Sequence, residues 1–114
     1  MAEQTDKLIL DVIDYRGNRV IFTEKKWKEK SILHPDLKSP KFIENLKNTI
    51  RCPNEVWQDY DDPKNKACYY KNYSPISYVK AVVWCKSNPC HIVSAFQTNK
   101  IKEEKYAPKL KRIK

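Results

Sequence analysis

The sequence predicts an α+β fold in which an N-terminal hairpin and two helices pack on a four-stranded antiparallel sheet. Hairpin and then helical patterns occupy the chain up to Pro53, and short apolar or aromatic runs separated by turn residues follow it. A chain of 114 residues is also the size of one ordinary domain. We therefore expect a single domain over residues 1–102, followed by a basic tail over residues 103–114 that is either solvated or takes part in binding.

The first predicted element is a β-hairpin. The runs "LILDVID" and "RVIFT" flank "YRGN", in which Gly17 and Asn18 tolerate the positive φ that a tight turn requires. Thr23 then has the character of a helix N-cap, and Phe22 and Trp27 are spaced as a hydrophobic staple. These residues predict a helix over "EKKWKEKSILH", which Pro35 ends.

The second predicted helix follows at once. Ser39 is placed to cap it, Pro40 suits its first position, and Pro53 closes the segment. Apolar and small residues recur at helical spacing between them, at Phe42, Ile43, Leu46, Thr49 and Ile50. This spacing predicts one buried helical face.

Four strand-like runs complete the fold: "EVWQDY", "KACYYKN", "SYVKAVVWC" and "CHIVSAFQT". Short turns between them predict an antiparallel meander. Strand alternation places Val79, Ala81, Val83 and Cys85 on one face, and Tyr78, Lys80, Val82 and Trp84 on the other. The first face can cover the helices, while the second is more polar and aromatic and stays available.

The composition bounds the function. The net charge of +9 arises from 23 basic and 14 acidic residues mixed along the chain, which favours a polyanionic partner. A single glycine excludes the glycine-rich loops of nucleotide-hydrolysing proteins. The N-terminal "MAEQTDKLILDVID" carries acids where a signal peptide has cations, and its apolar run is too short to span a membrane, so we expect a cytoplasmic protein with no membrane partner.

The four cysteines contain no CxxC pair, which favours free thiols in a reducing compartment. Two alternatives stay open for Cys85 and Cys90. With His91 beside them they could contribute to a metal site, or they could pair with each other across a hairpin.

Polar residues point to a cleft at one side of the sheet. His34 suits proton transfer near neutral pH, although a histidine before proline is equally typical of a helix C-cap. Lys80 interrupts an apolar strand, so it either reaches an edge or faces a cleft; Tyr69 and Lys71 share its parity on the preceding strand, which favours the cleft.

The two adjacent tyrosines and the last strand extend this cleft. Tyr69 and Tyr70 point to opposite faces, so at most one belongs to the core and the other is available to stack on a base, although strand aromatics are more often packing. On the last strand, Ser94 and Thr98 share a face with Phe96, and lysines follow. The alternative is an ordinary solvated strand end.

The residue types favour one chemistry. The acids of "QDYDDP" read as turn residues, so no carboxylate cluster suits a two-metal nuclease. Histidine, tyrosine, lysine and threonine suit RNA cleavage without a metal or cofactor, in which the 2′-hydroxyl attacks the neighbouring phosphorus. DNA, which lacks that hydroxyl, would not be a substrate.

The order "VIFTEKKWKEKSILHPDL", "IRCPNEVW", "CYYK", "YVKAVVW" and "IVSAFQTNKIK", over residues 20–102, resembles the barnase, EndoU, colicin and RelE-like (BECR) superfamily. The resemblance implies a RelE/barnase-like nuclease domain with two N-terminal helices on an antiparallel sheet. It also implies a metal-independent endoribonuclease, often a toxin held in check by an antitoxin. The family's polar sites would fall on His34, Tyr69 or Tyr70, Lys80, and Ser94 or Thr98.

These observations give a leading hypothesis: an endoribonuclease toxin that acts on tRNA, mRNA or ribosome-bound mRNA. His34 would act as base or acid, a tyrosine would stack or donate a proton, and Thr98 would orient the phosphate. The expected catalytic residues are His34, Tyr70, Lys80 and Thr98, and the expected substrate-binding residues are Tyr69, Lys71, Ser94, Lys100 and Lys102. Two alternatives are a non-catalytic RNA-binding module and a protein-interaction module with exposed Trp57 and Trp84.

Overall fold

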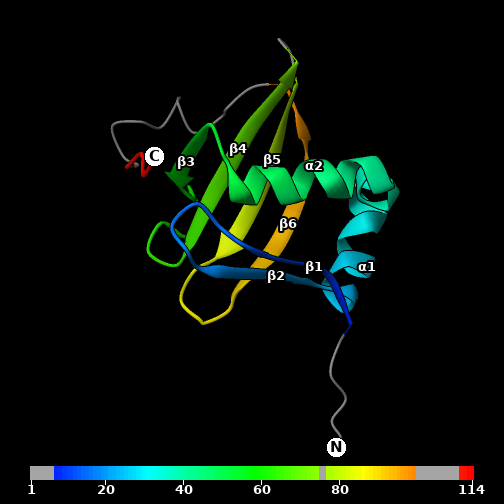
Figure 1. The fold of residues 1–114 in the computed structure, drawn as a ribbon, viewed down its shortest axis with the longest axis horizontal. Helices are drawn as coiled ribbons and strands as arrows, with labels where there is room; N and C mark the ends of the chain where they lie inside the picture. The colour runs from blue at the N-terminus through cyan, green and yellow to red at the C-terminus, as the bar shows by residue number, and fades with distance from the viewer. Residues whose placement is uncertain (1–6, 75–76, 100–110) are drawn as a thin grey trace, which may run out of the picture.

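The computed structural model describes residues 7–74, 77–99 and 111–114. Its helices are α1 (Glu24–Leu33), the 3₁₀ helix η1 (Pro35–Lys38) and α2 (Pro40–Arg51). Its strands are β1 (Leu8–Ile13), β2 (Arg19–Thr23), β3 (Glu55–Gln58), β4 (Lys66–Ser74), β5 (Ser77–Trp84) and β6 (Cys90–Thr98). The α+β class is confirmed (Figure 1).

The described strands form one six-stranded sheet in the order β1-β2-β6-β5-β4-β3. The antiparallel meander of β3 to β6 lies where the sequence predicts it. The prediction of a four-stranded, purely antiparallel sheet is wrong, because β2 pairs in parallel with β6 through Val20 to Cys90 and Ile21 to His91. Three consecutive apolar residues of β2, Val20 to Phe22, are buried, which is typical of an interior strand covered on both sides.

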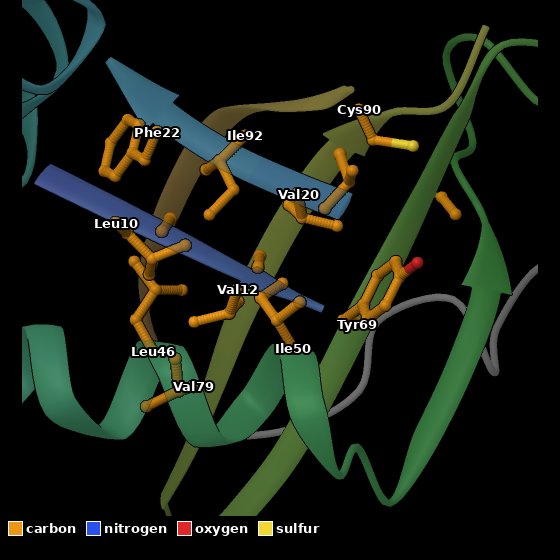
Figure 2. Close-up of a cluster of buried hydrophobic side chains, with 14 of the residues drawn as sticks. Leu10, Val12, Val20, Phe22, Leu46, Ile50, Tyr69, Val79, Cys90 and Ile92 are labelled. Atoms are coloured by element: carbon orange, nitrogen blue, oxygen red, sulfur yellow. The ribbon is translucent and has the colours of Figure 1, made fainter. Parts of the chain in front are cut away.

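The core lies on one face of β4, β5 and β6, between that face and a cover made of α2 and the β1–β2 hairpin (Figure 1). Figure 2 shows Leu10 and Val12 of the hairpin beside Leu46 and Ile50 of α2, with Tyr69 of β4 at the end of the cluster. All five of these side chains are buried. The hairpin therefore extends the sheet beyond β6, and its side chains also help to cover the core.

The two helices begin and end as their sequences predict. Ser39 caps α2 by accepting from the Phe42 N–H at 3.3 Å, and Pro40 occupies the first turn. Thr23 caps α1 by accepting from the Lys26 N–H at 3.2 Å. The indole of Trp27 donates to the Leu37 carbonyl at 2.7 Å, which ties α1 to η1. No helix in the described part of the chain is long and apolar enough to cross a membrane.

The hairpin turn is organised by a residue that the sequence did not single out. Asp14 Oδ1 accepts from the backbone N–H groups of Arg16 and Asn18, each at 2.9 Å. Gly17 adopts φ +90°, as expected, but Asn18 does not have a positive φ. A buried carboxylate therefore replaces the second left-handed residue of the predicted turn.

The described end of the tail lies along β3. Ile113 N–H donates to the Val56 carbonyl at 2.7 Å, and the Val56 N–H donates to the Lys114 carbonyl at 3.2 Å. Arg112 forms an antiparallel bridge with Trp57. Residues 111–114 are exposed, and their backbone lies along the outer edge of β3.

Candidate functional site

One row of side chains crosses three strands on the face of the sheet away from α2. The register pairs Tyr70 of β4 with Lys80 of β5, and Lys80 with Phe96 of β6. Directly paired residues of antiparallel strands point to the same side, so the three side chains are neighbours. Lys80 Nζ lies 5.6 Å from the ring centroids of both Tyr70 and Phe96, which is the distance of a cation–π contact.

His34 reaches the same row from a different part of the chain. Its imidazole stacks on the Phe96 ring, with centroids 4.7 Å apart and planes inclined by 20°. Its backbone N–H donates to the Lys30 carbonyl at 2.9 Å as the C-cap of α1, and Pro35 then starts η1. The two interpretations of His34 are thus compatible, because the backbone caps the helix while the side chain joins the sheet.

Two hydroxyl groups lie on the same face beside this row. Thr98 pairs with Tyr78, and Ser94 pairs with Val82, one row to either side of Phe96. The resulting surface, here called the Phe96 face, consists of His34, Tyr78, Lys80, Ser94, Phe96 and Thr98, all of them partly exposed. The structure therefore brings together four of the predicted polar residues around one aromatic ring.

Tyr70 lies beneath this face and not on it. Its side chain is 0% exposed, and its ring packs edge-on against Tyr78 at 6.4 Å. Its hydroxyl is buried and has no hydrogen-bond partner in the described structure. Tyr70 is thus placed to support Lys80 through its ring, while its hydroxyl is not presented to a substrate.

Tyr69 and Lys71 lie on the opposite face. The register pairs them with Ala81 and Val79, so the prediction that they share the parity of Lys80 is wrong. Lys71 Nζ instead donates to the Cys52 carbonyl at 2.9 Å, at the C-terminal end of α2. Parity between two strands depends on their register, which the alternation within each strand does not determine.

Tyr69 belongs to a polar cluster at the tip of the hairpin. Its hydroxyl donates to Asp14 Oδ2 at 2.8 Å, and burial together with this carboxylate raises the pKa of Tyr69. Burial also raises the pKa of the nearby Cys85 thiol to about 11. Tyr15 stacks edge-on against Tyr69 at 5.9 Å, and the Arg16 guanidinium lies 5.4 Å from the Tyr15 ring.

The remaining predicted residues are dispersed. Lys100 and Lys102 lie outside the described residues. Trp57 is only 7% exposed and donates from Nε1 to Glu55 Oε1 at 2.9 Å, so the expectation that it is exposed is wrong; Trp84 is half-buried.

All four cysteines are free in the structure, and Cys68 and Cys90 are buried. Within residues 7–74, 77–99 and 111–114, no group of three or more His, Cys, Asp or Glu side chains is arranged to hold a metal ion.

Two important residues were missed at the sequence level. Phe96 was placed on the correct face but was given no role, although an aromatic side chain between two hydroxyl residues of one strand face is itself a signal. Asp14 gave a weaker signal, since an acid beside a turn is common. Comparisons of the chain with protein families, with curated proteins and with solved structures found no match.

Proposed function

We propose that this protein binds single-stranded RNA on the Phe96 face and cleaves it without a metal ion. One observation carries the proposal: His34 and Lys80, which are 46 positions apart in the sequence (80 minus 34), meet at the ring of Phe96. A titratable imidazole, a cation and an aromatic platform on one partly exposed surface suit proton transfer, phosphate binding and base stacking, respectively.

The proposed reaction is an internal transesterification of RNA. The base removes the proton of a 2′-hydroxyl, the O2′ forms a bond to the adjacent phosphorus, and the bond from phosphorus to the 5′-oxygen breaks. The leaving oxygen then takes up a proton, which leaves a 2′,3′-cyclic phosphate and a 5′-hydroxyl. His34 takes the proton from the 2′-hydroxyl and delivers it to the leaving oxygen, and Lys80 stabilises the extra negative charge on the phosphorane.

Phe96 orients these groups. Its ring holds the His34 imidazole in a nearly parallel stack, so the imidazole has a defined position above the sheet. Thr98 supplies a hydroxyl on the same face, in the role of orienting the phosphate. Membership of the BECR superfamily, action as a toxin in the cytoplasm and neutralisation by an antitoxin belong to this proposal and depend on it.

A second candidate function is RNA binding without cleavage. The burial of the Tyr70 hydroxyl favours it, because this burial removes one of the two expected proton-transferring groups from the surface. The cationic and aromatic side chains would still bind RNA, with an affinity that falls steeply as the salt concentration rises.

The test is incubation of the purified protein with total cellular RNA in excess chelator, followed by chemical analysis of the fragment ends. Fragments with 2′,3′-cyclic phosphate are expected from the wild type. His34→Phe keeps an aromatic ring for stacking but removes proton transfer, so it should bind RNA as before and cleave about 100-fold more slowly.

Two lysine variants complete the test. Lys80→Ala should weaken both binding and cleavage, whereas Lys86→Ala removes the same charge from an exposed position in the loop between β5 and β6 and should change neither by more than about twofold. Salt-sensitive binding of RNA that stays intact would support the second candidate. Neither binding nor cleavage would contradict both.

A further inference from the structure

A small polar pocket lies at the N-terminal end of α2, where this helix meets η1 and the end of β6. Its volume is about 180 Å³, below the range of pockets for drug-sized ligands and suited to a single planar fragment. The lining residues are Asp36, Ser39, Lys41, Phe42, Asn45 and Gln97. None of them belongs to the Phe96 face.

The lining offers the hydrogen-bonding groups of base recognition. Asn45 and Gln97 each carry a carboxamide, which presents a donor beside an acceptor and so matches the edge of a nucleobase. Asp36 adds a second acceptor, and Lys41 adds a cation. The buried ring of Phe42 contributes the apolar part of the lining.

The two carboxamides differ in how they are held. Gln97 Nε2 donates to Ser77 Oγ at 2.6 Å, which fixes its orientation and leaves its oxygen available. The backbone carbonyl of Asn45 accepts from the hydroxyls of Thr49 and Tyr73, but its carboxamide has no hydrogen-bond partner among the described residues. Asn45 is therefore free to pair with a ligand from a backbone that is held in place.

The pocket and the Phe96 face are built by the same two segments. Gln97 directly follows Phe96 in β6, and Asp36 lies two residues after His34. Alternation along β6 sends Phe96 to one side of the sheet and Gln97 to the other, so the two sites lie on opposite sides of the same strand end. A single strand held on the Phe96 face can thus continue over the end of β6 to the pocket.

We propose that this pocket binds one unpaired base of the same RNA strand and that it favours a base with an exocyclic amino group over uracil. Asp36 and the carboxamide oxygens are acceptors that an amino group of adenine, cytosine or guanine can satisfy, and uracil has no such group. The proposal rests on the proposed function, since it names the sequence preference of the RNA that the Phe96 face binds. Asp36, whose carboxylate can only accept, and the oxygen of Gln97 are the specificity-determining groups, and Asn45 helps to hold the base.

The experiment uses a pool of random-sequence RNA and sequences the ends of the cleaved fragments. The wild type should cut with uracil depleted about tenfold at one fixed position relative to the cut. Asn45→Leu and Asp36→Ala should abolish this depletion. Asn48→Leu, which makes the same substitution on α2 outside the pocket, should keep the depletion.

The outcomes separate the two proposals. Cleavage without a positional bias, or a bias that survives Asn45→Leu, overturns the pocket proposal and leaves the proposed function standing. If the wild type binds but does not cleave, the same bias is read from the RNA retained by the protein. If it neither binds nor cleaves, the proposed function fails and the pocket proposal fails with it.

Discussion

Tyr69 and Tyr70 are neighbours in β4, and both side chains are 0% exposed, yet their hydroxyl groups have opposite surroundings. The Tyr69 hydroxyl donates to Asp14 at 2.8 Å, whereas the Tyr70 hydroxyl has no partner in the described structure. Buried polar groups are normally hydrogen-bonded, and leaving one unbonded is unfavourable. The two hydroxyls differ because Asp14 lies beside Tyr69 on the side of α2 and the hairpin, and no such acceptor lies beside Tyr70 on the other side.

The two faces also differ in the side chains around Lys80. The face under α2 carries small and branched apolar side chains that are buried, such as Val79, Ala81 and Val83. The other face carries Lys80 between two aromatic rings, with a histidine stacked on one of them. A lysine in a central strand does not stabilise a core, so this arrangement fits a surface that serves binding.

The largest effect should come from exchanging large side chains for alanine on the two faces. Leu46→Ala should lower the free energy of unfolding by about 3 kcal/mol, because it leaves a cavity in the core. Phe96→Ala should cost only about 1 kcal/mol, because Phe96 is half-buried, but it should weaken RNA binding. Urea unfolding measures the stability of each variant, and RNA titration measures its affinity. Equal effects of the two variants on RNA binding would contradict the division between the faces.

The second prediction concerns Asp14, the buried carboxylate at the tip of the hairpin. Asp14→Ala removes the acceptor of the Tyr69 hydroxyl and of two turn N–H groups, so it should lower the free energy of unfolding by about 3 kcal/mol. Asp11→Ala is the matched control. Its carboxylate forms an exposed ion pair with Arg19 at 2.8 Å, so its removal should change stability much less than Asp14→Ala does. A small effect at Asp14 would show that the turn forms without its cap.

A sharper test removes one hydroxyl at a time. Tyr69→Phe should lower the free energy of unfolding by about 1.5 kcal/mol, because it breaks a hydrogen bond to a buried carboxylate. Tyr70→Phe removes a hydroxyl that has no partner, so stability should stay within about 0.5 kcal/mol of the wild type or rise. Chemical denaturation of both variants measures these changes in the free energy of unfolding. A loss of stability in Tyr70→Phe as large as that in Tyr69→Phe would mean that the Tyr70 hydroxyl is hydrogen-bonded in solution.

The smallest effect should appear as a pH dependence. The unfolded Cys85 thiol loses its proton near pH 9, while the folded thiol keeps it up to about pH 11. Between these values the unfolded state binds fewer protons, so stability is complete below pH 9 and falls as the pH rises towards 11. The raised pKa of Tyr69 acts in the same direction at higher pH.

Urea midpoints at pH 8 and pH 10.5 measure this fall. Cys85→Ala should reduce the fall without abolishing it, since Tyr69 still contributes. Cys52→Ala is the control, because Cys52 is exposed and its removal should leave the pH profile of stability unchanged. A profile that is insensitive to Cys85→Ala would assign the whole dependence to other groups.

The sequence by itself determined the helices, the strand positions and the alternation along each strand. These features depend on local signals: caps at Thr23 and Ser39, prolines that end helices, and apolar periodicity. The same local signals also placed Lys80 and Phe96 on the more polar sides of their strands, and His34 at a helix end. Local backbone geometry fixes such features without reference to the rest of the chain.

Only the tertiary structure decided which of these faces meet. The register of β4 against β5 put Lys80 beside Tyr70 and not Tyr69, and a register is set by pairing between strands and not by the alternation within one. The parallel pairing of β2 with β6 turned the hairpin into a cover of the core, and the turn at Pro35 brought His34 onto Phe96. Such long-range contacts depend on the packing of whole elements, which a pattern within one segment does not encode.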